Sequence, residues 1–84
     1  MIYLVKKIES VEPYRICLLF NTGEVKTINL YDSLLEWSRT PDSKFRDLLD
    51  PEYFTNVRLD SELDTIYWDN GIDLSPEMLY GMAE

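Results

Sequence analysis

The run from Asp69 to Asp73, Asp-Asn-Gly-Ile-Asp, contains residue types that could hold a divalent cation. Mg²⁺ and Ca²⁺ prefer carboxylate oxygens, and Asp60 could join the run from a neighbouring element. The spacing does not fit an EF-hand loop, because Gly71 at the sixth position would place Ile66 rather than an aspartate at the first. A tight turn that leads into a helix explains the run better. We therefore expect no metal site here.

Other side chains with catalytic potential are scarce. The sequence has no histidine, which excludes Ser-His-Asp and Cys-His nucleophile pairs. Cys17 is the single cysteine, so an intrachain disulfide and a zinc site of cysteines and histidines are both excluded. The three glycines are too far apart for a phosphate-binding loop or a dinucleotide fingerprint. We predict that the protein is not an enzyme and binds no cofactor.

Acidic residues are concentrated in the second half of the chain. Residues 1–46 hold seven basic and six acidic side chains, whereas residues 47–84 hold ten acidic side chains and one base, Arg58. Loops and first helical turns favour Asp and Glu, which is one explanation. The other is an acidic binding face, with Asp60, Glu62 and Asp64 projecting into solvent from a polar turn. We expect Arg58 to pair with an acid such as Asp69.

Aromatic residues are abundant, with six Tyr and two Trp among 84 residues. Such side chains anchor interfaces because they bury a large area and keep a polar tip for hydrogen bonding. Tyr31, Trp37, Tyr67 and Tyr80 are the candidates for an interaction surface. The alternative is that they fill a small core, as we expect of Trp68 at the end of a strand.

Three strands are predicted in the first half of the chain. The predicted strands are segments rich in β-branched and aromatic residues: Ile2–Glu9, Tyr14–Phe20 and Glu24–Leu30. The turn Asn21-Thr22-Gly23 closes a hairpin between the second and the third strand. The second strand alternates strictly, so one set of its residues faces the core: Ile16, Leu18 and Phe20.

Short helices are predicted after these strands. Asp32 or Ser33 can cap the first helix, since Ser33 begins a capping box. Ser43 or Lys44 opens a second helix, and Pro51–Phe54 reads as a further helical turn.

The remainder of the chain predicts a hairpin and a last helix. We predict that the strands of this hairpin are Val57–Leu59 and Thr65–Trp68. We also predict that Ser75 caps a helix over Pro76–Met82. We predict an α+β fold in a single domain of residues 1–84. Its small antiparallel sheet contains the three N-terminal strands and the C-terminal hairpin, with helices packed on one face.

Several motifs of the second half resemble the bacterial domain-of-unknown-function 2442 family. They are D-P-x-x-F at Asp50–Phe54, W-x-N-G-x-D at Trp68–Asp73 and P-x-x-L-Y at Pro76–Tyr80. The likeness extends to the N-terminal hairpin and so covers nearly the whole chain. It implies a compact α+β domain, found alone or in front of a helix-turn-helix module, with no implied activity. The segment Ser33–Lys44 is longer than this family pattern leads us to expect.

These features favour a non-enzymatic interaction module that binds a basic protein partner through its acidic, aromatic half, as an antitoxin-like or regulatory subunit would. A small-ligand sensor with an apolar pocket is the alternative, and a metal-dependent enzyme is a third. The net charge of −8 and the lack of a helix-turn-helix segment argue against direct nucleic-acid binding. No apolar run is long enough for a membrane span, and we expect a cytoplasmic protein that forms a homo-oligomer.

Overall fold

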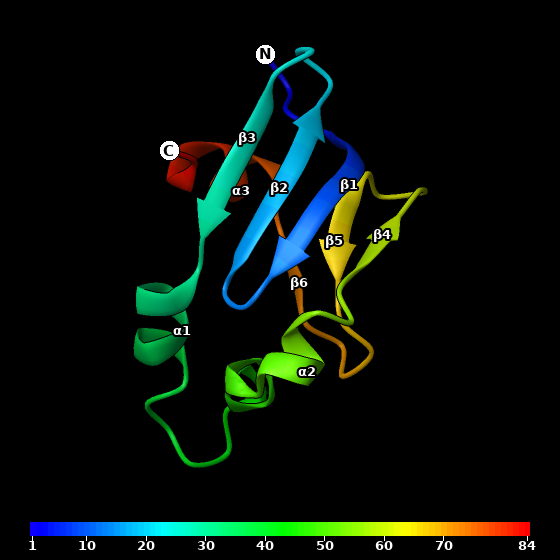
Figure 1. Ribbon diagram of the computed structural model, residues 1–84. Helices are drawn as coiled ribbons and strands as arrows, with labels where there is room; N and C mark the ends of the chain where they lie inside the picture. Colours follow the sequence, from blue (N-terminus) through cyan, green and yellow to red (C-terminus); the bar gives the residue numbers. More distant parts are fainter.

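The structure is a computed structural model that describes residues 1–84. It contains two three-stranded antiparallel sheets, here called sheet A and sheet B, with helical segments after each (Figure 1). The strands of sheet A are β1 (Val5–Glu12), β2 (Arg15–Phe20) and β3 (Val25–Asn29). The strands of sheet B are β4 (Arg58–Asp60), β5 (Thr65–Tyr67) and β6 (Asp73–Leu74). The helical segments are α1 (Tyr31–Trp37), the 3₁₀ helix η1 (Lys44–Leu49), α2 (Pro51–Phe54) and α3 (Pro76–Met82). The predicted α+β fold is confirmed.

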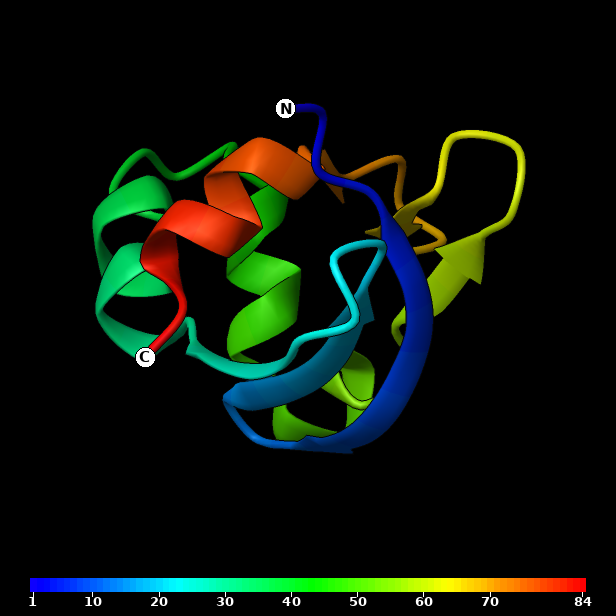
Figure 2. The same ribbon diagram turned by 90° about the horizontal axis from the view of Figure 1, so that it is seen from above.

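Sheet A has β2 at its centre, paired with β1 on one side and β3 on the other. The predicted alternation of β2 is confirmed, because Ile16, Leu18 and Phe20 are buried while Arg15 is exposed. Seen from above, sheet A curves around one side of the core and α3 crosses the opposite side (Figure 2). The curvature agrees with two register shifts in the β1–β2 ladder, since irregular pairing bends a strand.

The first strand lies later in the sequence than Ile2–Glu9, the predicted range. Residues before Val5 do not join the ladder because the Asn21 side chain binds their backbone. Its Oδ1 accepts from the Leu4 N–H at 2.9 Å, and its Nδ2 donates to the Ile2 carbonyl at 2.8 Å. The strand then continues to Glu12, where a tight turn leads directly into β2.

The first helix begins before the predicted caps. Leu30 occupies the N-cap position without a side-chain cap, and the Asn29 side chain accepts from the Tyr31 N–H at 3.0 Å. The capping-box prediction at Ser33 was therefore wrong, because burial of Leu30 places the start of the helix directly after β3. The next segments agree with prediction: Ser43 caps η1.

Sheet B contains the predicted C-terminal hairpin together with a third strand, β6, that was not predicted. The two sheets are separate, whereas the sequence predicted that the hairpin would join the N-terminal strands in one sheet. They meet where the Val5 N–H donates to the Asp64 carbonyl at 2.8 Å. Asp64 adopts a positive φ of 52°, which tightens the turn between β4 and β5.

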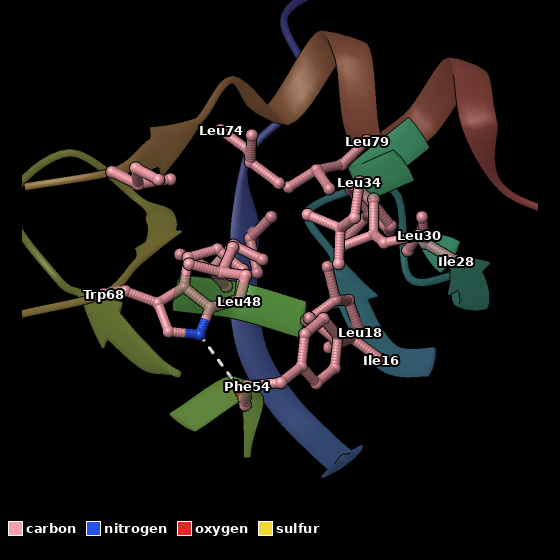
Figure 3. Close-up of a cluster of buried hydrophobic side chains, with 14 residues drawn as sticks. Ile16, Leu18, Ile28, Leu30, Leu34, Leu48, Phe54, Trp68, Leu74 and Leu79 are labelled. Carbon is pink, nitrogen blue, oxygen red and sulfur yellow. Dashed lines mark hydrogen bonds between the residues drawn. The ribbon is translucent and has the colours of Figure 1, made fainter. Parts of the chain in front are cut away.

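A core of 14 buried hydrophobic residues connects both sheets and the helices (Figure 3). Trp68 is 1% exposed, and its Nε1–H donates to the Phe54 carbonyl at 3.0 Å. The prediction that Trp68 fills the core is confirmed. Leu34 of α1 and Leu48 of η1 are also fully buried, so the long segment between β3 and β4 closes one end of the core.

Candidate interaction surface

The outer face of sheet B brings an aromatic residue of the central strand β5 together with one charged residue from each of the two outer strands. Tyr67 of β5 lies directly opposite Arg58 of β4 and directly opposite Asp73 of β6. Directly opposite residues point to the same face of a sheet. The neighbouring residue of β5, Ile66, is buried, so the Tyr67 row faces away from the core. The structure thus places half-buried Tyr67 between a base and an exposed acid.

The single base of the acidic half is already paired on this face. The Nε of Arg58 lies 3.7 Å from Oδ1 of Asp69, which confirms the predicted pair. Both side chains are more than half exposed, at 62% and 61%, so water screens the attraction. Asp73 has no basic partner among the ion pairs of the structure. The face therefore keeps a negative charge next to Tyr67.

The predicted acidic turn is only partly a solvent-facing feature. Oδ1 of Asp60 accepts from the N–H groups of Glu62 and Leu63, at 2.9 and 3.1 Å. The Asp64 carboxylate lies 3.3 Å from Nζ of Lys6 and is 27% exposed. The expectation that all three acids project into solvent was wrong for Asp60 and Asp64, because both shape the turn. Glu62 is exposed as predicted.

Two further candidates, Tyr31 and Trp37, lie on α1 and not on sheet B. Trp37 is half-buried and packs against Phe45, with ring centroids 5.0 Å apart. Tyr31 remains 45% exposed and contacts Tyr14 at 5.3 Å between centroids. The packing of Trp37 favours the alternative that it fills the core.

Tyr80 is the centre of a separate cluster that joins α3 to β3 and to the N-terminal segment. Its ring stacks on Tyr3 at 3.8 Å between centroids, and Nζ of Lys26 lies 4.4 Å from the ring centroid. Its hydroxyl donates to Oε1 of Glu24 at 2.6 Å. This hydrogen bond raises the pKa of Tyr80 to about 12, and the same bond lowers the pKa of Glu24. Tyr80 therefore already has partners within the chain.

Sequence reasoning did not identify the partners of the Asp69-Asn70-Gly71 turn. The Asn70 side chain donates to the Lys44 carbonyl at 3.1 Å and to Asp47 at 3.0 Å, and its Oδ1 accepts from the Ile72 N–H. Gly71 has a φ of 94°, as the predicted turn requires. The bonds to Lys44 and Asp47 hold the turn between β5 and β6 against η1. The Asn-Gly signal marks the turn, but no pattern in the sequence shows what the amide binds.

No group of three or more potential ligand side chains could hold a metal ion, and the structure contains no pocket. None of the helices has the length and apolar character needed to cross a bilayer.

Comparison with known proteins places the chain in a family. The sequence profile described as protein of unknown function DUF2442 matches residues 5–84. The chain belongs to the DUF2442 family. No curated protein matches this sequence.

A solved structure has the same fold as this DUF2442 chain. It is the crystal structure of a putative DNA-binding protein from Nitrosomonas europaea ATCC 19718, with a TM-score of 0.75 and 27% sequence identity. The match covers 96% of this chain and 48% of that protein, so this chain spans about half the length of its relative.

Proposed function

We propose that this domain is a non-enzymatic interaction module that binds a basic protein through the outer face of sheet B. The observation that carries the proposal is the row formed by Tyr67 with exposed Asp73. A half-buried tyrosine offers contact area, and a carboxylate beside it favours a lysine or arginine of the partner.

The charge of the surrounding segment supports a basic partner. Residues 47–84 hold ten acidic side chains against one base, and that base already pairs with Asp69. An acidic surface increases the rate of encounter with a positive surface. The same charge disfavours contact with phosphate groups, so we do not propose that sheet B binds DNA.

The Nitrosomonas europaea relative suggests the kind of partner. That protein is described as putative DNA-binding, and it is about twice as long as the matched segment. A surface that binds DNA is basic, and sheet B would be complementary to it. We propose a regulatory role in which this domain binds a DNA-binding protein and competes with its nucleic acid.

Charge reversal with a matched control tests the proposal. The partner is captured from a lysate of the host with the tagged protein and identified by mass spectrometry. Asp73→Lys should lower its association rate about tenfold at low salt, because the variant places a positive charge beside Tyr67. Asp42→Lys introduces the same charge at an exposed position between α1 and η1 and should have little effect.

Two tyrosine variants test whether the Tyr67 side chain contributes to holding the partner. Tyr67→Ala should accelerate dissociation, whereas Tyr31→Ala on α1 should not. An association rate that is equal at low and high salt would show that the acidic face serves solubility only. Equal effects of Asp73→Lys and Asp42→Lys would place the binding surface elsewhere.

A further inference from the structure

The outer edge of β3 exposes backbone groups that no neighbouring strand covers. The Phe20 N–H donates to the Glu24 carbonyl at 2.9 Å, and the Leu30 N–H donates to the Tyr14 carbonyl at 2.8 Å. In an antiparallel pair, alternate residues bond to the partner strand. Val25 and Thr27, one and three residues beyond Glu24, therefore point their N–H and C=O groups away from β2. The Glu84 N–H donates to the Thr27 carbonyl at 3.0 Å, which agrees with this direction.

The other edges are poorly suited to pairing with an additional strand. β1 contains two register shifts, and its first residues contact the turn of sheet B. The edge strand β4 has three residues and β6 has two. Irregular pairing and short length each protect an edge from strand addition. The β3 edge pairs regularly with β2 over five residues, and its uncharged Val25 is 54% exposed between two residues of opposite charge, Glu24 and Lys26.

Glu84 limits where another strand can pair along β3. Because Glu84 holds the Thr27 carbonyl, the open part of the edge is centred on Val25. An antiparallel strand from a second copy would then place Val25 opposite Val25 of that copy. In this register Glu24 lies opposite Lys26 of the second copy, and Lys26 lies opposite its Glu24. The pairing is self-complementary in charge, although each chain has a net charge of −8.

Exposed apolar side chains lie near the end of β3 that begins with Val25. The Asn21 amide holds the Ile2 carbonyl beside the turn between β2 and β3 (Figure 1). Ile2 is 69% exposed and Met1 is 91% exposed. Such residues lose unfavourable contact with water when a second molecule covers them.

We propose that two copies of this chain form a symmetric dimer by pairing their β3 edges antiparallel across Val25, with Glu24 of each copy facing Lys26 of the other. This surface is distinct from the Tyr67 face of sheet B. The dimer and the binding of a basic partner can therefore succeed or fail separately.

Charge variants tested singly and together provide the decisive experiment. Lys26→Glu and Glu24→Lys each place like charges opposite one another in a homodimer, so each alone should sediment as a monomer. An equimolar mixture restores both cross-strand pairs and should form a heterodimer. Each substitution also breaks the ion pair between Lys26 Nζ and Glu24 Oε2 of the same chain, at 3.6 Å, and alters the contacts of these residues with Tyr80. Mixing cannot repair such a defect within one chain. Sedimentation velocity over a concentration series measures all three samples beside the unmodified protein.

A backbone variant gives an independent check. Val25→Pro removes the outward N–H and should raise the dimer dissociation constant by at least about tenfold, because both exchanged hydrogen bonds are lost. Val25→Thr keeps the N–H and should dimerise nearly as well. A monomeric unmodified protein at the highest soluble concentration overturns the proposal. So does a Val25→Pro variant that still dimerises, or a mixture of charge variants that remains monomeric.

Discussion

Sheets A and B are both three-stranded and antiparallel, but different interactions stabilise them. The strands of sheet A have eight, six and five residues, and they contribute Val5 and alternate residues of β2 to the core. The strands of sheet B have three, three and two residues, too few to form a stable sheet without outside contacts. Those contacts come from α2 through Trp68, from η1 through Asn70 and from β1 through Val5.

The difference separates the residues that stabilise the domain from those of the surface that we propose for binding. Most of the inward-facing side chains of sheet A belong to the core, so their removal would destabilise the fold. Sheet B is stabilised mainly at its ends and on its inner face, so its outer face is open to variation. Substitutions on this face, at Tyr67 and Asp73 among others, should therefore cost little folding stability, which suits the binding role that we propose for it.

The largest expected change in the free energy of unfolding comes from a substitution on the inner face of sheet A. Leu18→Ala should lower the free energy of unfolding by about 3 kcal/mol, because the side chain is fully buried and its loss leaves a cavity. Chemical denaturation measures the change. Leu19→Ala, on the opposite face of the same strand, is the control and should cost clearly less. Equal losses would contradict the assignment of faces.

The next effect breaks a contact that supports sheet B. Trp68→Phe should cost about 2 kcal/mol, because it leaves the Phe54 carbonyl without its donor and removes part of a buried ring. Hydrogen exchange should accelerate in β5 and β6 more than in β2. Trp37→Phe is the matched control, since Trp37 is only half-buried. Uniform acceleration across both sheets would mean that they unfold together.

A smaller effect concerns the helix that follows sheet B. The Ser75 hydroxyl accepts from the Met78 N–H at 3.1 Å, so Ser75→Ala should cost about 1 kcal/mol. Ser75→Asp retains an acceptor and should be nearly neutral. The denaturation midpoints of the two variants provide the comparison, and an unchanged midpoint for Ser75→Ala would argue against the cap.

The smallest expected effect is a pH dependence of stability that arises from the hydrogen bond between Tyr80 of α3 and Glu24, next to β3. Tyr80 binds its proton more tightly in the folded state, with a pKa of about 12 against an ordinary value of 10.0. Its contribution to stability is therefore present below pH 10.0 and is lost as the pH rises toward about 12. Glu24 has a lowered pKa, so its contribution is present above its ordinary value of 4.5 and is lost as the pH falls through the folded value.

Tyrosinate absorbance during an alkaline titration tests this assignment. The folded protein should show a late ionisation step near pH 12 from Tyr80, and Tyr80→Phe should remove that late step. A late step that persists in Tyr80→Phe would assign it to another residue.

The sequence predicts elements well where the signal is local. Ser75, Pro76 and Glu77 mark the start of α3 because a cap, an N1 proline and an acid are read within one turn. The alternation of β2 likewise shows which residues enter the core. The motif-based family assignment was correct for the same reason, since its spacing lies within continuous segments.

Prediction from the sequence fails where contacts with residues far away in the chain determine the local structure. Strand β6 has two residues and is defined only by its pairing with β5. The start of β1 depends on Asn21, and the start of α1 depends on burial of Leu30. For the candidate surface, Tyr67 was identified from its type, but Asp73 required the register of sheet B.

The two ends of the chain lie against the same strand. Tyr3 stacks on Tyr80 beside β3, and Glu84 binds Thr27 within β3. A short flexible linker could therefore join the ends, and the domain could be inserted into a surface loop of another protein as a cassette. In such a fusion both junctions would lie beside sheet A. The β3 edge would then lie close to the host protein.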